Sequence, residues 1–226
     1  MANESLLLTI AVLGGTGKEG KGLTYRWAKA GYRMLIGSRS SERAVTAASE
    51  IMQLLEGSPS VVGMTNLEAA EQADIVVLAV PYSAHRETLE SVKDVLKGKL
   101  LVDAVVPLVP PKVRKVQMPP AGSAAQEARE IVGEEVEVVA AFQNVSHEHL
   151  LGEEYVDCDV LVTGTSKKAR AEVLTLVEAA GLIGWDAGPI ENSVVVEGLT
   201  SVLININKHY GCTYAGIKIT GASHHS

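Results

Sequence analysis

Three glycines near the start of the chain have the spacing of a dinucleotide-binding loop. They are Gly15, Gly17 and Gly20, within the segment GGTGKEGKG. In such a loop the first glycine permits a tight turn, the second lets a pyrophosphate approach the backbone, and the third lets a helix pack closely on a strand. An apolar run at 7–13 precedes the loop and a helical pattern follows it, so the first amides of that helix would face the phosphates. The alternative is a turn that is rich in glycine only for packing.

Two charged residues, Lys18 and Glu19, stand inside this loop. Lys18 would add attraction to a phosphate, whereas a carboxylate directed at a phosphate would be repelled. We therefore expect the Glu19 side chain to turn to solvent or to pair with Lys18 or Lys21.

The residues after the second apolar run distinguish the two common dinucleotides. A chain that binds NAD usually has an Asp or Glu there, on the ribose 2′-hydroxyl. Here the sequence is IGSRSSER, with Ser38 and Arg39 at the strand end and Arg43 one helical turn later. Because arginine forks fit phosphate oxygens, the segment predicts NADP, held through its 2′-phosphate. The alternative is a solvated, charged loop.

Polar residues also follow two later apolar runs. In VPYSAHR, Pro81 fixes a turn, Tyr82 is placed to cover a ribose and Arg86 to reach a phosphate, while His85 is expected on the helix surface rather than as a catalytic base. The segment FQNVSHEH groups Gln143 with further polar residues, namely Asn144, Ser146, His147 and His149. A metal pair of the two histidines on a strand is one interpretation, but no third ligand stands nearby. A polar wall around a flat heterocycle is the preferred one.

The sequence contains no nucleophile elbow and no Cys–His pair. A reaction that requires only the alignment of two cofactors fits this pattern, and direct hydride transfer is such a reaction. We therefore expect no catalytic side chain and no metal.

Apolar runs that alternate with helical patterns must position these residues. Strands are predicted at 7–13, 32–36, 74–80, 99–103, 136–142, 159–163 and 183–186. Helices are predicted at 20–30, 41–55, 67–72, 85–96, 123–132 and 193–210, with another after Ser166, and a basic, proline-rich loop is predicted at 107–120. Thr65 to Glu68 matches a capping box that opens the helix at 67–72. This alternation is typical of an α/β fold with a doubly wound, mostly parallel Rossmann-type sheet and a small C-terminal helical segment. We expect two units, residues 1–188 for the nucleotide and 189–226 for the rest of the site.

Composition limits the classes of partner. The 226 residues carry a net charge of -7, which argues against binding to nucleic acid or a membrane surface. The apolar run near the N-terminus is too short to span a membrane. Cys158 and Cys212 lack metal or redox spacing, so free, buried thiols in a reducing cytoplasm are expected.

Five segments resemble the NADPH-dependent coenzyme F420 reductases, also called F420H2:NADP oxidoreductases. In chain order they are LGGTGKEGKGL, GSRSSERA, DIVVLAVPY, EGLTSVLININKHYG and AGIKITG. The resemblance extends over nearly the whole chain, and its most specific part is Glu197–Lys218. Archaeal members have a His where Gln143 stands and a Trp where Tyr82 stands, and the loop at 107–120 is longer and more basic here.

This resemblance implies hydride transfer between C4 of the nicotinamide of NADP and C5 of the deazaflavin F420. It implies that NADP contacts Gly15, Thr16, Gly17, Lys18, Glu19, Ser38, Arg39, Arg43, Val80, Pro81, Tyr82, Arg86, Val106 and Asn144. It implies that the deazaflavin contacts Gln143, Asn144, Val145, Ser146, Asn207, Ala215, Gly216 and Ile217. It also implies a homodimer, to which the helix Val194–Ile206 contributes. Three alternatives stay open: an NADPH-dependent reductase of a flavin, a reductase of a small imine or ketone, and a non-catalytic NADP-sensing module.

Overall fold

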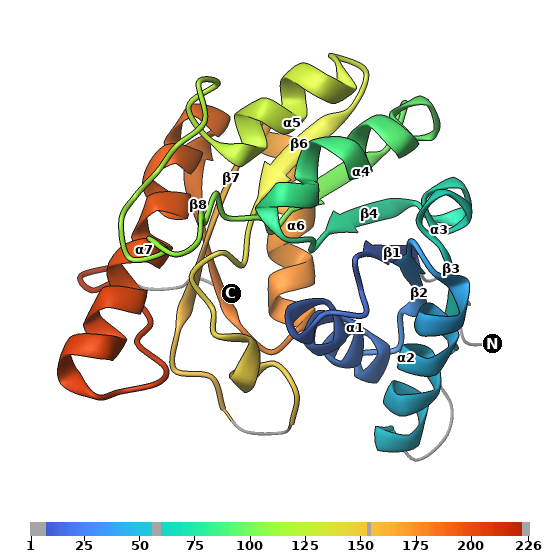
Figure 1. Cartoon of the computed structure of the whole chain (residues 1–226), viewed down its shortest axis with the longest axis horizontal. Coiled ribbons are helices and arrows are strands. Elements are labelled where there is room, and N and C mark those ends of the chain that lie inside the picture. Colours follow the sequence, from blue (N-terminus) through green and yellow to red (C-terminus); the bar gives the residue numbers. More distant parts are fainter. Residues whose placement is uncertain (1–7, 56–59, 153–154, 223–226) are drawn as a thin grey trace.

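A computed structural model describes residues 8–55, 60–152 and 155–222. Within this part the strands form one sheet of eight, in the order β3-β2-β1-β4-β5-β6-β7-β8 (Figure 1). All neighbouring strands are parallel except β6 and β7, which are antiparallel. The strands are β1 (Thr9–Leu13), β2 (Arg33–Ser38), β3 (Val61–Thr65), β4 (Ile75–Leu78), β5 (Leu100–Asp103), β6 (Glu137–Ala140), β7 (Asp159–Gly164) and β8 (Ile183–Pro189). The order of the first six is that of a Rossmann-type nucleotide-binding sheet, which confirms the predicted fold class.

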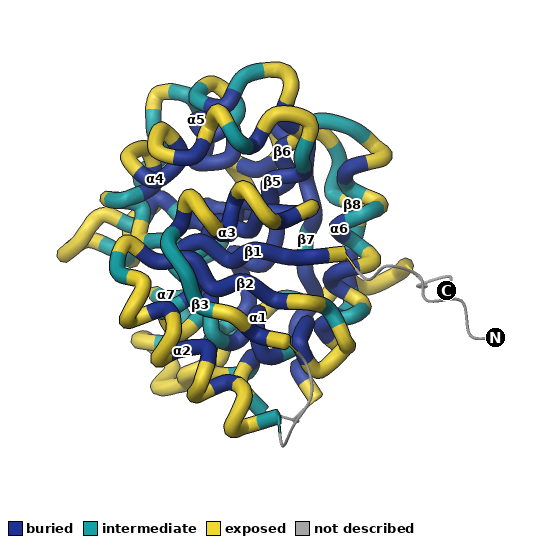
Figure 2. The backbone as a smooth tube through the Cα atoms, turned by 90° about the vertical axis from the view of Figure 1, so that its right-hand side faces the viewer, coloured by how far each residue is buried: buried dark blue, intermediate teal, exposed yellow. Residues whose placement is uncertain are grey.

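Helices cover both faces of the sheet, and the strand interior is buried while the outer sides of the helices are exposed (Figure 2). The helices are α1 (Lys18–Lys29), α2 (Ser41–Leu54), α3 (Asn66–Gln72), α4 (His85–Val92), α5 (Ala124–Val132), α6 (Lys167–Ala179) and α7 (Ser193–Tyr210). Alternate side chains of each strand point to opposite faces, so Val12 packs with α1, α2 and α6, and Leu13 packs with α3, α4 and α5. The result is two apolar cores, one on each side of the sheet.

Local sequence explains where several helices begin. The side chains of Ser40, Ser123 and Ser166 accept hydrogen bonds from the amides three residues later and cap α2, α5 and α6. Thr65 and Glu68 form the capping box predicted for α3, in which each side chain bonds the other residue's amide. Helix α7 has the bounds that its apolar periodicity predicts.

The sequence reading missed one strand. Strand β3 forms the edge of the sheet beside β2 and is only partly buried, and Gly63 interrupts its short apolar pattern. The structure requires this glycine, because a Cβ there would overlap the main chain of Ala44 in α2. Gly63 therefore marks a close contact between α2 and the strand.

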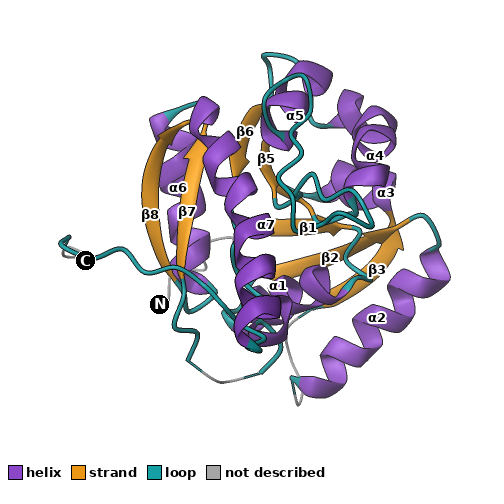
Figure 3. Ribbon diagram, turned by 60° about the vertical axis from the view of Figure 1, so that its left-hand side comes forward, coloured by secondary structure: helices purple, strands orange, loops and turns teal. Residues whose placement is uncertain are grey.

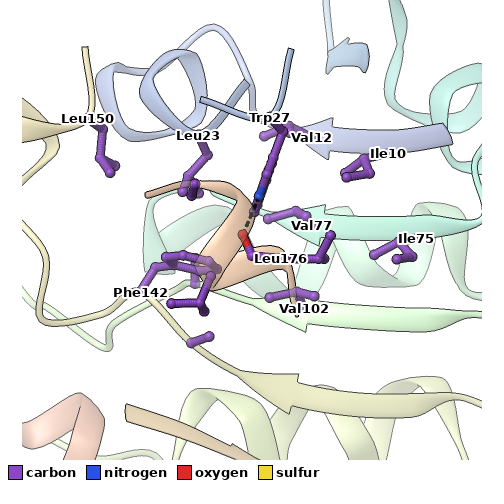
Figure 4. Close-up of a cluster of buried hydrophobic side chains, with 14 of the residues drawn as sticks. Ile10, Val12, Leu23, Trp27, Ile75, Val77, Val102, Phe142, Leu150 and Leu176 are labelled. Carbon is purple, nitrogen blue, oxygen red and sulfur yellow. Dashed lines mark hydrogen bonds between the residues drawn. The ribbon is translucent and has the colours of Figure 1, made fainter. Parts of the chain in front are cut away.

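A buried aromatic pair sets the direction of the chain after β6. Trp27 donates a hydrogen bond from Nε1 to the carbonyl of Leu176 (2.8 Å) and meets the Phe142 ring edge-on at 5.6 Å (Figure 4). Phe142 has φ of 78°, an uncommon value for a residue other than glycine. This strained turn directs the next two residues, Gln143 and Asn144, away from the line of the strand.

Helix α7 lies outside the two helical layers and crosses the end of the sheet (Figure 3). It starts beside the end of β7, where Ser193 hydrogen-bonds Thr163 through their hydroxyl groups (2.6 Å). Farther along, Thr200 donates to the carbonyl of Gln143 (2.7 Å), which fixes the helix beside the carboxyl end of β6. The helix ends before Gly211, which has the left-handed conformation expected at this position.

Candidate functional site

A cavity of about 710 Å³ lies at the carboxyl ends of β1, β4, β5 and β6, and α7 and the loop after β5 form its other walls. It brings together thirteen of the residues predicted from the sequence: Gly17, Lys18, Glu19, Val80, Pro81, Tyr82, Val106, Gln143, Asn144, Val145, Ser146, Asn207 and Ala215. Thr16 and Arg43 line a neighbouring cavity of about 350 Å³ between α1 and α2. Gly15, Ser38, Arg39, Arg86, Gly216 and Ile217 do not line either of these two cavities.

The glycine loop has the geometry of a phosphate-binding turn. A Cβ on Gly20 would lie 2.7 Å from Cα of Gly15, so helix and loop pack as closely as the motif requires. Gly17 has only one atom, the carbonyl oxygen of Gly14, near the position of a Cβ, and faces the cavity. Helix α1 begins after Gly17, which has no side chain to cap it, so its first amides are available to an anion.

The end of β2 offers cations and carries no acid of its own, although Glu42 and Glu50 of α2 line the smaller cavity together with Arg43. Ser38 is buried, whereas Arg39 and Arg43 are exposed, and neither guanidinium forms an ion pair with a described residue. Across the smaller cavity, Lys21 of α1 forms an ion pair with Glu50 of α2. Among the described residues, the two arginines thus place positive charge without an ion pair just beyond the end of β2.

The prediction for Glu19 is wrong. Its side chain lines the large cavity instead of turning to solvent, and Lys21 pairs with Glu50 instead. Burial, followed by the charge of Asp103, raises the pKa of Glu19 to about 8. This position could not be predicted from neighbours along the chain, because the charge that acts on Glu19 belongs to Asp103 at the end of β5.

The prediction for His85 is also wrong, because this residue is fully buried. Its Nε2 lies 2.8 Å from Oδ2 of Asp103, and its Nδ1 lies 3.8 Å from Oε2 of Glu127. Burial disfavours the charged imidazole, but the carboxylates of Asp103 and Glu127 outweigh it and raise the pKa of His85. Glu127 also accepts hydrogen bonds from Tyr82 (2.9 Å) and Arg86 (2.6 Å), so Arg86 is engaged there rather than in the cavity.

Two buried amide side chains have unpaired oxygens beside the cavity. Gln143 donates from Nε2 to the carbonyl of Asp103 (2.7 Å), and Asn144 donates from Nδ2 to the carbonyl of Asp159 (2.6 Å). These bonds fix both side chains, yet Oε1 of Gln143 and Oδ1 of Asn144 accept no hydrogen bond from a described residue. Because buried acceptors are rarely left unpaired, this wall suits a ligand with N–H donors on its ring.

Asp159 holds the end of the chain against the site. Its amide donates to the carbonyl of Ile217 (2.8 Å), and its carboxylate accepts from the amide of Ile219 (2.8 Å) and pairs with Lys218. Although burial opposes ionisation, these donors lower the pKa of Asp159. Ala215, whose amide donates to Oδ1 of Asn207 (2.8 Å), is thereby placed in the cavity wall.

Further lining residues escaped the sequence reading. Helix α7 contributes Thr200, Leu203 and Ile204, and the loop after β5 contributes Leu108, Pro110 and Val113. The helical period predicted an apolar face on α7, but only the packing of α7 shows which side faces the cavity.

His147 and His149 lie in a short 3₁₀ turn rather than on a strand, and the centres of the His149 and Tyr214 rings lie 4.4 Å apart with the rings inclined at 58°. Within the described ranges, no three His, Cys, Asp or Glu side chains gather as metal ligands. Both cysteines are free, but Cys212 is exposed and not buried. Of the described helices, none combines the length and hydropathy needed to cross a bilayer.

Fold and site together define the class, a Rossmann-type protein with a site for a dinucleotide. Residues 9–107 match the family model described as "NADP oxidoreductase coenzyme F420-dependent". The chain is 41% identical over 220 residues to the F420-dependent NADP reductase of Methanothermobacter marburgensis, and 37% identical over 221 residues to that of Methanocaldococcus jannaschii. Each match covers 94% of this chain and 98% of the relative. The chain belongs to the family of coenzyme F420-dependent NADP oxidoreductases.

A solved structure agrees with this assignment. A crystal structure from Arthrobacter sp. FB24, provisionally described as an F420-dependent NADP reductase, superposes with a TM-score of 0.81. It is 26% identical in sequence, and the match covers 94% of this chain and 99% of that one.

Proposed function

We propose that this enzyme transfers a hydride between NADP(H) and the deazaflavin coenzyme F420. The observation that carries the proposal is the large cavity itself. Its walls include the open N-terminus of α1, suited to a pyrophosphate, and the side chains of Gln143 and Asn144, whose unpaired amide oxygens are suited to a ring with N–H donors. Both features lie within one cavity, so two flat cofactors can be held in contact.

The nucleotide half uses the chain from β1 to β4. The amides at the start of α1 bind the pyrophosphate, with Lys18 as an added positive charge. Ser38, Arg39 and Arg43 bind the 2′-phosphate beyond the end of β2. Val80, Pro81 and Tyr82 line the cavity after β4 and flank the ribose and the nicotinamide. Burial and the hydrogen bond to Glu127 raise the pKa of Tyr82 to about 12, so its hydroxyl stays neutral.

The acceptor half uses the chain after β6 together with residues 189–226, which we propose as the unit that completes this site. Gln143, Asn144 and Ser146 form its polar wall, and Asn207 and Ala215 form the wall beside α7. When both cofactors are bound, C4 of the nicotinamide gives a hydride to C5 of the deazaflavin, and one proton completes the reduced ring. The protein aligns the two rings and excludes water.

The assembly that we propose is a cytoplasmic homodimer. Helix α7 carries Val195, Leu199, Val202 and Ile206 at spacings of four, three and four, which place them on one stripe. Val195 is 70% exposed and Val202 is 47% exposed, while the side of α7 with Leu203 and Asn207 faces the cavity. An apolar stripe of this kind is suited to pair with the same stripe of a second copy.

The test is a direct assay of turnover. Purified protein is mixed with NADPH and oxidised F420, and the absorbance of the deazaflavin is followed. We expect its loss together with the formation of NADP. NADPH binding without turnover would contradict the proposal and favour a sensing module, whereas turnover only with a flavin or a small imine would identify one of the reductase alternatives.

Cofactor choice is tested in the same assay. The variant Arg39→Ala/Arg43→Ala loses charge-assisted contacts worth roughly 1.5–3 kcal/mol each. The KM for NADPH should therefore rise at least about a hundredfold, and the KM for NADH should change little. Equal losses for both cofactors would show that the 2′-phosphate lies elsewhere, and Arg33→Ala, at the exposed amino end of β2, is the control.

A further inference from the structure

The loop between β5 and α5 is a folded wall of the large cavity. Leu108, Pro110 and Val113 line the cavity from this loop. The loop then runs beside α7 (Figure 1), where Gly198 leaves room for Val116 and Met118: a Cβ there would lie 3.4 Å and 3.3 Å from their terminal carbons. Internal bonds stiffen it, among them the amide of Lys112 to the carbonyl of Val109 (3.1 Å) and the amide of Lys115 to the carbonyl of Lys112 (2.9 Å).

The same turn presents three positive charges in four residues, Lys112, Arg114 and Lys115. All three are exposed, and none forms an ion pair with a described residue. The chain as a whole has a net charge of -7, so this cluster is a local exception. Unpaired like charges in one turn repel each other, and a bound polyanion would remove that repulsion.

Given the proposed function, on which this inference rests, we propose that Lys112, Arg114 and Lys115 bind a side chain with several negative charges on the acceptor coenzyme. The acceptor ring would lie in the cavity, and its anionic chain would leave past Leu108 and Val113 toward the three cations.

The position of the cluster separates it from the nucleotide. The loop follows β5 and contacts α7, whereas the arginines assigned to the 2′-phosphate follow β2. The strand order places β1 and β4 between β2 and β5. A charge at the loop therefore acts on the acceptor half of the cavity and leaves the 2′-phosphate contacts intact.

The test compares two acceptors, F420 and the same deazaflavin ring with only a neutral ribityl chain. The variant is Lys112→Gln/Arg114→Gln/Lys115→Gln. A matched control, Lys93→Gln/Lys167→Gln/Lys168→Gln, removes the same net charge from exposed residues. These residues lie near the amino ends of the parallel strands β1 to β6, opposite to the cavity. A third variant, Lys112→Arg/Arg114→Lys/Lys115→Arg, keeps the charge of the loop. Binding of each acceptor is titrated by fluorescence beside the kinetics.

We expect the first variant to raise the KM and the dissociation constant for F420 about tenfold at low salt, because three exposed ion pairs contribute roughly 0.5 kcal/mol each. Added salt should reduce the difference from the wild type through screening. The neutral acceptor, the control and the charge-preserving variant should behave like the wild type. Equal losses with both acceptors, or no loss, would overturn the inference. If the wild type binds F420 without turnover, the proposed function is contradicted, whereas the role proposed for the loop in binding is not.

Discussion

At the scale of single residues, the carboxyl groups around the large cavity are the least ordinary feature. Glu19 faces this cavity from the glycine loop, and Asp103 lies behind it as the partner of buried His85. Burial and like charge make ionisation of Glu19 unfavourable, which is why its pKa rises to about 8. At neutral pH its carboxyl group therefore remains mainly protonated, so it does not oppose a pyrophosphate at the start of α1.

This shift predicts a pH dependence of stability. A carboxyl group whose pKa is near 4.5 when unfolded and about 8 when folded binds its proton more tightly in the folded state, so its contribution falls as the pH rises from 4.5 to 8. The variant Glu19→Gln should remove this part of the pH dependence of the free energy of unfolding. At pH 8.5 its free energy of unfolding should exceed that of the wild type by about 1–3 kcal/mol, since the partial exposure of Glu19 reduces the full effect. Urea unfolding at pH 5 and 8.5 measures it. Glu42→Gln on exposed α2 is the control, and an unchanged slope in Glu19→Gln would contradict the assignment.

At the scale of elements, one buried contact ties α7 to the start of α5. Glu197 of α7 is fully buried and accepts hydrogen bonds from the amides of Ala124 (2.6 Å) and Ala125 (3.1 Å) at the start of α5. Burial and the charge of Asp103 raise the pKa of Glu197 to about 8, against the effect of these amides. The side chain acts as a cap supplied by another helix, and it fixes α7 beside the loop that precedes α5.

Loss of this cap should be costly. Glu197→Ala leaves two buried amides without an acceptor and should lower the free energy of unfolding by about 2–4 kcal/mol. Glu197→Gln retains one carbonyl oxygen and should lose less than half as much. Urea unfolding at pH 7 provides the measurement, with Glu191→Ala on the exposed turn before α7 as the control. A loss below 1 kcal/mol for the alanine variant would show that the contact adds little.

The features that could be predicted from the sequence are those determined by residues close to one another along the chain. The glycine loop, the Thr65–Glu68 capping box and the bounds of α7 follow from neighbours along the chain, and the structure confirms them. The burial of His85 depends on Asp103, eighteen residues later on the next strand, and so could not be read locally. The prediction of where the Glu19 side chain points was wrong for the same reason. The binding roles of the site residues stay predictions.

At the scale of the whole molecule, the exposed stripe of α7 predicts how copies associate. Val195→Asp/Val202→Asp places two charges in the proposed interface and should convert a dimer to a monomer at micromolar concentration, because a buried, unpaired charge is strongly unfavourable. Light scattering after size exclusion measures the mass. Val45→Asp/Leu54→Asp on α2, where the side chains are 52% and 59% exposed, is the control and should leave the dimer intact. A monomeric wild type would contradict the assignment.

The reversal of β7 gives the site an order of completion. Because β7 runs opposite to β6, its first residue, Asp159, stands on the same side as the ends of the parallel strands, and there it holds Ile217 and Ile219. During synthesis the chain emerges from its N-terminus. The glycine loop and the ends of β2 and β4 leave the ribosome before the walls formed by α7 and Ala215, which follow them in the chain. In a nascent chain, the segments of the nucleotide half are thus complete before the segments that bind the acceptor.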